Sequence, residues 1–135
     1  MMQPSAVRGK RHGQLGDGLV EFALILPVLM LFIMGILDLG RAVYAYNVVA
    51  NCAREGARYG LTSPTDDAGM VSVSTSAAVG LDHTQMTVTV THPTTDSIRV
   101  VVRYTFHLVT PLVAEALSGR STLVLSSSTT MYTGY

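Results

Sequence analysis

The chain has 135 residues, a length that suits one domain and is too short for two. Nine basic and nine acidic side chains give a formal net charge of zero, which argues against nucleic acid as a partner because no overall basic field attracts it. Only 13% of the residues are charged, 48% are apolar and the mean hydropathy is +0.37, so part of the chain is expected to lie in lipid. A single cysteine, Cys52, excludes an internal disulfide and a cysteine-based zinc site.

The first forty residues contain a basic segment followed by an apolar run. Three Lys and Arg residues precede any acidic residue, and no charged side chain occurs from Phe22 to Leu37. Extended back to Leu19, the run forms a helix of roughly 28 Å, just enough to cross a bilayer. The positive-inside rule predicts a cytoplasmic N-terminus and an extracytoplasmic part after Leu39. A removable signal peptide is the alternative, although its apolar region is usually shorter, about 7–15 residues.

Glu21 lies at the edge of this apolar run. A carboxylate costs about 2.5–3.5 kcal/mol at the centre of a membrane helix and less near the interface, so Glu21 needs a partner or must reach the headgroup layer. The sequence around it reads LGDGLVEF from Leu15 to Phe22. Cleavage after Gly16 would make Glu21 the fifth residue of the mature chain and Phe22 the sixth, a spacing that no other nearby glycine gives.

This arrangement resembles the processing site of type IV prepilins and pseudopilins, with a basic leader, a glycine before the cut, a glutamate at position five and an aromatic residue at six. The resemblance implies that a prepilin peptidase cuts after Gly16 and frees the α-amine of Asp17. In a bundle of subunits, the Glu21 carboxylate of one chain can pair with that amine on a neighbour, and wrong registers are disfavoured because they leave a buried charge unpaired. Asp17 departs from the apolar or aromatic first residue of many major pilins.

The helical pattern continues past the membrane. Apolar residues recur in steps of three and four while polar residues group on another side, which predicts one helix from Leu19 to Gly60, about 63 Å long, with a kink at Pro27. The apolar face beyond the membrane is expected to consist of Leu39, Val43, Tyr46, Ala50, Ala53 and Ala57.

Three sequence blocks make the resemblance more specific: VEFALILP at 20–27, DLGR at 38–41 and NCAREGARY at 51–59. They look like the blocks of the TadE-like family, the minor pilins or pseudopilins of the tight-adherence pilus machinery, although Cys52 stands where alanine is common. The resemblance is close over residues 13–60 and looser in the C-terminal half.

The charged residues of this helix are candidates for subunit interaction together with Glu21. One interpretation makes Asp38–Arg41 and Glu55–Arg58 surface pairs, each worth about 0.2–0.5 kcal/mol. The other makes them, with Arg54, contacts to partner subunits. Small residues lie between these charges and predict close packing of the following domain onto the helix; they are Ala50, Ala53, Gly56, Ala57 and Gly60.

After Gly60 the composition changes to Ser, Thr, Asp and Val. Ser63 as N-cap and Pro64 at the first helical position predict a helix over residues 64–79, which Gly80 ends. Alternating patterns predict an antiparallel hairpin of residues 86–91 and 98–106 with a turn between them. The inward-facing residues are expected to be Met86, Val88, Val90, Ile98, Val100, Val102, Tyr104 and Phe106.

A short helix is expected over residues 110–117, and a third strand over 123–132. The chain therefore divides into a basic leader (1–16), a transmembrane and stalk helix (17–60) and an exported head (61–135). The fold class is α+β, a long N-terminal transmembrane helix that continues into a small pilin-like head. Its short antiparallel sheet is expected to lie on the exposed half of the helix.

No catalytic set is recognisable in the sequence. The histidines share no spacing, and a Gly-x-Ser-x-Gly turn, a phosphate loop and a His-Glu-x-x-His helix are all missing. We therefore expect no enzymatic activity, cofactor, metal site or small-molecule substrate. Cys52 is expected to be a packing residue, with an intermolecular disulfide as the alternative in an oxidising compartment.

The sequence thus predicts a pseudopilin or minor pilin of the inner membrane, processed after Gly16. Its expected partners are the membrane, the prepilin peptidase, other pilins or pseudopilins and the pilus assembly platform, in a tight-adherence pilus for adhesion or secretion. One alternative is a single-pass anchored binding module or adhesin. The other is an exported soluble domain of unknown activity.

Overall fold

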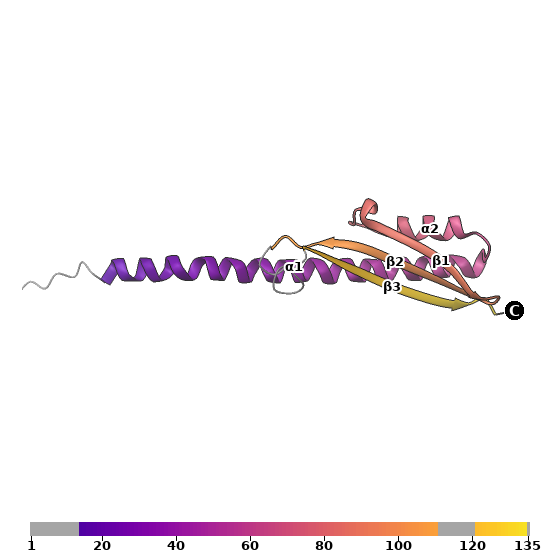
Figure 1. Ribbon diagram of the computed structural model, residues 1–135, viewed down its shortest axis with the longest axis horizontal. Coiled ribbons are helices and arrows are strands. Elements are labelled where there is room, and N and C mark those ends of the chain that lie inside the picture. The colour runs from indigo at the N-terminus through magenta and orange to yellow at the C-terminus, as the bar shows by residue number, and fades with distance from the viewer. Residues whose placement is uncertain (1–13, 111–120, 135) are drawn as a thin grey trace, which may run out of the picture.

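The computed structural model describes residues 14–110 and 121–134. Figure 1 shows one long helix running the length of the molecule, with a second helix and a sheet packed beside its C-terminal part. The predicted α+β architecture is confirmed. The elements in chain order are α1 (Gln14–Thr62), α2 (Asp67–Ser76), the short 3-10 helix η1 (His83–Gln85), β1 (Met86–Thr94), β2 (Ser97–His107) and β3 (Thr122–Tyr132).

Helix α1 contains 49 residues and includes the whole segment predicted as helix. It continues unbroken past Pro27, and Figure 1 shows a straight axis where we expected a kink. A proline removes one backbone hydrogen bond, and the turns on both sides of it keep theirs. An 18-residue window of α1 has a mean hydropathy of 2.6 and is not covered by any other described part of the chain. The helix is therefore long and apolar enough to cross a membrane.

Helix α2 is shorter than predicted and begins later. Asp66, not Ser63, is its N-cap, and the Asp66 carboxylate accepts a hydrogen bond of 2.9 Å from the backbone N–H of Gly69. Residues 63–66 form a turn instead, closed by a 3.2 Å bond from the Asp66 N–H to the Ser63 carbonyl. The helix ends at Ser76, ahead of Gly80, which lies in a later turn with a positive φ of 73°.

The sheet has the strand order β1-β2-β3, and both pairings are antiparallel. The predicted hairpin and third strand are confirmed. The turn is shorter than expected, because β1 continues to Thr94 after a register shift and β2 starts at Ser97. The short helix predicted over 110–117 lies outside the described residues, apart from Thr110.

The core lies between the inner face of the sheet, α1 and α2. On β2 all the predicted inward residues but one are buried, and Met86, Val88, Val90 and Tyr104 are half-buried and pack against them, which confirms the predicted inner face. The buried core cluster consists of Val49, Cys52, Ala53, Ala57, Met70, Ala78, Ile98, Val100 and Val102.

Small residues of α1 let the head approach its backbone, as predicted. A Cβ on Gly56 would overlap the Ser74 hydroxyl of α2, and one on Gly60 would lie 2.9 Å from Cδ1 of Ile98. No larger residue fits at Gly56 unless α2 moves away. The predicted packing of the head onto this part of the helix is therefore confirmed.

The head covers only the C-terminal part of the apolar face predicted for the stalk. Leu39, Val43 and Tyr46 are 65%, 53% and 49% exposed, whereas Asp38 and Ala45 are buried. Near its C-terminus, α1 is covered by both the sheet and α2, so small residues on two neighbouring sides of the helix are buried. Closer to the membrane-spanning part, α2 no longer covers the helix (Figure 1), and only the side that carries Asp38 and Ala45 is buried.

Candidate functional site: three zones along the long helix

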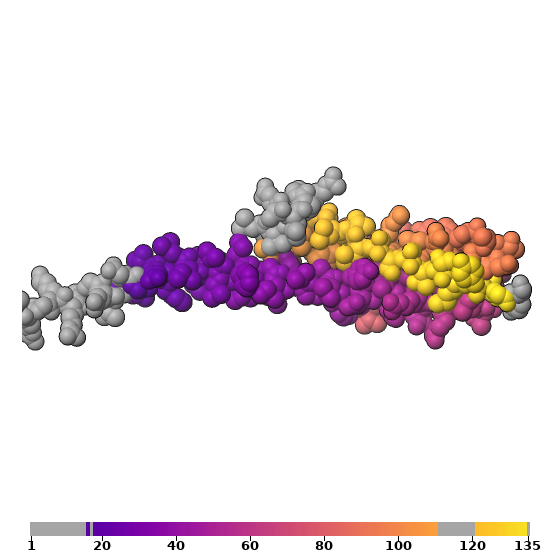
Figure 2. Space-filling model, turned by 90° about the horizontal axis from the view of Figure 1, so that it is seen from below, coloured from indigo at the N-terminus to yellow at the C-terminus, as the bar shows by residue number. Residues whose placement is uncertain are grey.

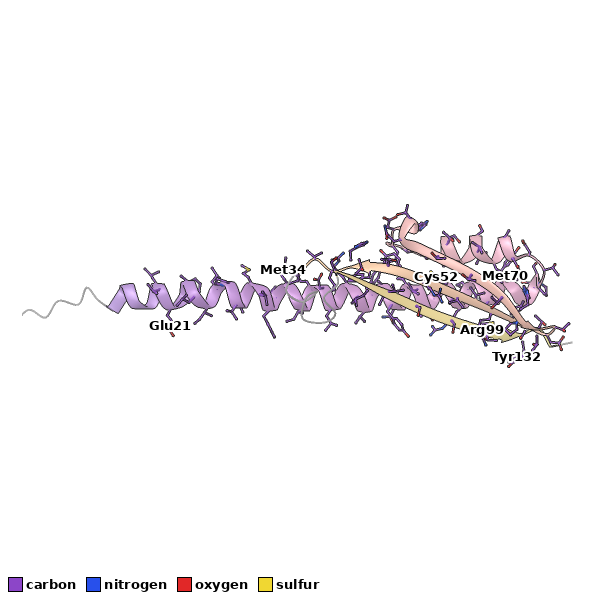
Figure 3. The ribbon with its side chains drawn as sticks, in the orientation of Figure 1. Glu21, Met34, Cys52, Met70, Arg99 and Tyr132 are labelled. Carbon is purple, nitrogen blue, oxygen red and sulfur yellow. The ribbon has the colours of Figure 1, made fainter. Side chains whose placement is uncertain are left out.

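The predicted processing residues lie in the bare N-terminal part of α1. Gly16, Glu21 and Phe22 are exposed, and the backbone of Asp17 is helical. Figure 3 shows the Glu21 side chain extending away from the helix, with no other element of the described chain near it. Within residues 14–110 and 121–134, Glu21 forms no ion pair. Its carboxylate is therefore free to meet a cation from outside this part of the chain.

The apolar side chains of α1 stay uncovered well beyond the stretch needed to span a bilayer. Figure 2 shows the uncovered part of α1 projecting from the head as a single bare helix. Every large apolar side chain described from Leu19 to Leu39 is exposed, and Val43, Tyr44 and Tyr46 are exposed beyond them. Apolar surface of this extent, outside lipid, is characteristic of an interaction surface.

Asp38 joins this bare part to the head. Its carboxylate is only 3% exposed and accepts hydrogen bonds from the backbone N–H groups of Val109, at 3.1 Å, and Thr110, at 2.8 Å. Burial raises the pKa of this carboxyl, but the hydrogen bonds from Thr110 and Val109 and the charge of Arg41 outweigh burial, so the pKa lies below its ordinary value. Asp38 thus fixes the segment that follows β2 to the helix.

Arg41 lies beside Asp38 and faces outward. One guanidinium nitrogen is 3.3 Å from the Asp38 carboxylate, and the group lies 5.4 Å from the centre of the Phe106 ring, within cation–π range. The predicted Asp38–Arg41 pair is present, but Asp38 is buried within its own subunit. Arg41 keeps more than half of its side chain exposed and is the member of the pair that a neighbour can reach.

The third zone lies near the C-terminal end of α1. Arg58 and Glu55 form the predicted pair, at 2.8 Å, and Arg54 is exposed beside them. Since this pair is at the surface, it contributes little to the stability of the subunit. A hollow of about 450 Å³ opens next to it, lined by Glu55, Arg58, Tyr59, Leu61, Thr62 and Val73.

These zones are separate positions on one rod. At 1.5 Å per residue, Glu21 lies about 26 Å from Asp38 and about 51 Å from Glu55 along the helix axis. The structure therefore does not gather the predicted residues into one pocket. Three zones spaced along one helix suit a partner that lies lengthwise against that helix.

Sequence reasoning missed the long-range contacts that hold the head to the rod. Tyr44 donates a hydrogen bond of 3.0 Å to the Val79 carbonyl, and His92 lies 3.0 Å from the Pro64 carbonyl. The partners of Asp38 are 71 and 72 residues away. No local pattern marks such pairs, although the DLGR block did single out Asp38.

Cys52 is fully buried in the core, and burial raises the pKa of its thiol. Both observations agree with the packing role predicted for it, because a buried thiol is shielded from other subunits. Among the described residues, no group of three or more His, Cys, Asp or Glu side chains is placed to hold a metal ion.

In the comparisons with known proteins, the part of the chain that matches lies within α1. A model of the family described as TadE-like protein matches residues 16–58, from the glycine of the predicted cut to the last arginine of the third sequence block. No curated protein and no solved structure matches the chain. The predicted resemblance to the TadE-like family is confirmed over these residues.

Proposed function

From the TadE-like identity of α1, we propose that the chain is a pseudopilin or minor pilin that a prepilin peptidase cuts after Gly16 and that then assembles into, or at one end of, a tight-adherence pilus. Its N-terminus lies in the cytoplasm, α1 crosses the inner membrane, and the head lies outside it. Its partners are other pilin subunits and the assembly platform. Its role is in assembly and not in catalysis.

The observation that carries this proposal is the apolar surface of α1 that extends past the membrane-spanning stretch. A bilayer is crossed in about 20 residues, and the run from Leu19 to Leu37 is long enough to do so. The uncovered apolar side chains continue to Tyr46, nine residues further. A simple anchor has no use for this extension, whereas a helix that packs lengthwise against neighbouring helices does.

Glu21 supports the same proposal by its lack of a partner within the described chain. Cleavage after Gly16 supplies an α-amine four residues before it, on Asp17. When helices pack side by side, the amine of one subunit can neutralise the Glu21 carboxylate of the next. A register that separates the two charges in an apolar medium is penalised, so the pair fixes the stagger between subunits.

The cut is tested by the pair of variants Gly16→Ala and Gly18→Ala. The two glycines are matched, because a Cβ at either position meets nothing within 4 Å. We expect Gly16→Ala to accumulate with its leader attached and to block pilus formation, whereas Gly18→Ala is processed normally. Mass spectrometry of the membrane-extracted wild type should find Asp17 as the first residue.

Other first residues would contradict the proposal. A wild-type chain that keeps its leader would favour the anchored binding module, which is indifferent to Gly16→Ala. The signal-peptide alternative has a possible cleavage site after Val43-Tyr44-Ala45, so a chain that starts at Tyr46 would instead identify a removed signal peptide.

A further inference from the structure

The sheet has a second face, turned away from α1, that the proposed assembly does not use. Antiparallel pairing aligns residues of the three strands in rows across this face. Every residue in three consecutive rows is exposed except Val101, which is half-buried. The rows are Thr87–Arg103–Ser126, Thr89–Val101–Ser128 and Thr91–Arg99–Thr130. We call them the outer face.

The outer face combines two positive charges with rows of hydroxyl groups. Arg99 and Arg103 are its only charged residues and lie four residues apart on β2, about 13 Å along the strand. The Nε of Arg99 donates a hydrogen bond of 3.1 Å to the Thr130 hydroxyl, which orients its guanidinium toward β3. Neither arginine forms an ion pair within residues 14–110 and 121–134.

The carboxylates that the structure describes on this subunit's own head are mostly engaged. Asp66 and Asp82 cap helices, and Asp96 is exposed in the turn between β1 and β2. Asp67 lies 3.6 Å from His92. These acids form no free cluster that would match two arginines on a second copy, so charge complementarity favours an acidic partner from outside.

The chemistry of the outer face also narrows the class of that partner. A guanidinium binds carboxylates through two parallel hydrogen bonds, and Ser and Thr hydroxyls donate and accept equally well. None of the nine residues of the outer face is aromatic, so it lacks the stacking platform that single-stranded nucleic acids need. Figure 3 places Arg99 and Tyr132 at the end of the head farthest from the bare helix, where a large polymer has access.

We propose that the outer face binds a linear acidic polysaccharide, with Arg99 and Arg103 each holding one of its carboxylates and the Ser and Thr rows bonding its sugar hydroxyls. In a cell this interaction rests on the proposed function, because it requires the head to lie outside the membrane. It would give the pilus a site for adhesion. The binding itself is a property of the single subunit and is measurable without a pilus.

The test uses the full chain in detergent micelles and polygalacturonate as the acidic polymer, with dextran as the neutral one. The double variant Arg99→Gln, Arg103→Gln removes both charges from the outer face. Its matched control, Arg54→Gln, Arg58→Gln, removes two exposed arginines from α1. We expect the wild type and the control to bind polygalacturonate and the outer-face variant to bind at least about tenfold more weakly. Binding to dextran should be weaker for all three, and added salt should weaken polygalacturonate binding.

Several results would overturn the inference. An equal loss of polygalacturonate binding in both double variants would show that the polymer is attracted to net positive charge alone and not to the outer face. Equal binding of an oligonucleotide and polygalacturonate would show a general polyanion surface, and no binding of polygalacturonate by the wild type would remove the site. A processing failure in the Gly16 experiment would leave this measurement unaffected, so the two proposals fail separately.

Discussion

The two halves of α1 have the same secondary structure and opposite surroundings. In the N-terminal half the apolar residues are large and exposed, such as Leu24 and Phe32, and no described element covers them. Where the head packs on the C-terminal half, the apolar residues that it covers are mostly small, such as Ala53 and Ala57. Along one continuous helix, the size of the apolar side chains therefore determines what can pack against each part. Large side chains suit lipid and other helices, whereas small ones let the chain's own head approach closely.

The largest expected effect comes from the bare half and concerns assembly. We expect Glu21→Gln to abolish pilus formation, because a neutral side chain no longer penalises wrong staggers between subunits. The control is Asp96→Asn, which removes an exposed carboxylate from the turn between β1 and β2, outside the three zones of α1.

Counting pili by electron microscopy in cells that express either variant checks this expectation. Normal numbers of pili with Glu21→Gln would refute the proposed role of the glutamate. Equal loss of pili with Asp96→Asn would show that the effect of Glu21→Gln is not specific to the bare part of α1.

The second prediction compares a glycine of α1 that packs against the head with one that does not. We expect Gly56→Leu to destabilise the head by about 3 kcal/mol or more, because the new side chain overlaps Ser74 and α2 must move away. Gly40→Leu adds the same side chain where nothing lies within 4 Å, so the head should keep its stability. Urea unfolding of the detergent-solubilised chain, followed by tyrosine fluorescence, measures both. Similar midpoints for the two variants would show that the contrast between the halves is overstated.

The third prediction concerns the boundary between the halves. We expect Asp38→Asn to cost about 2 kcal/mol at neutral pH, because it weakens charge-assisted hydrogen bonds from Val109 and Thr110. The folded-state pKa of Asp38 is lowered, so its stabilising contribution is present above the unfolded-state pKa of about 3.9 and is lost as the pH falls through the folded-state value.

Stability measured across pH 3 to pH 7 should therefore show the gap between wild type and Asp38→Asn closing below about pH 4. The exposed turn residue Asp96 offers the control, since Asp96→Asn should leave stability unchanged. A gap that stays constant with pH would mean that shape, and not the charge of Asp38, holds the segment.

The features that the sequence predicted well are those with a local signal. Alternating residues marked β2 and its inner face, Ile98 and Val100 included, and the apolar run marked α1. Small residues around Gly56 predicted where the head would pack, because only a close approach of two backbones requires them.

The errors arose where a local pattern had two readings or needed a distant partner. Ser63 and Asp66 both suit an N-cap, and Asp66 takes that place because Gly69 and Tyr59 donate hydrogen bonds to its carboxylate. The periodicity of α1 identified an apolar stripe but not what covers it, so it did not distinguish exposed Leu39 from buried Ala53. The candidate contact residues were located by sequence blocks alone, and the burial of Asp38 depends on residues more than seventy positions away.

The close approach of the head at Gly56 and Gly60 has a geometric consequence for any filament. With no layer of long side chains between them, the head cannot swivel about the axis of α1. The direction in which the outer face points is then locked to the direction of the exposed apolar stripe on the same helix. Any symmetry that packs the helices also sets the azimuth and spacing of the arginine pairs along the fibre. A slip of one helical turn between neighbours would shift that display by about 5.4 Å along the fibre.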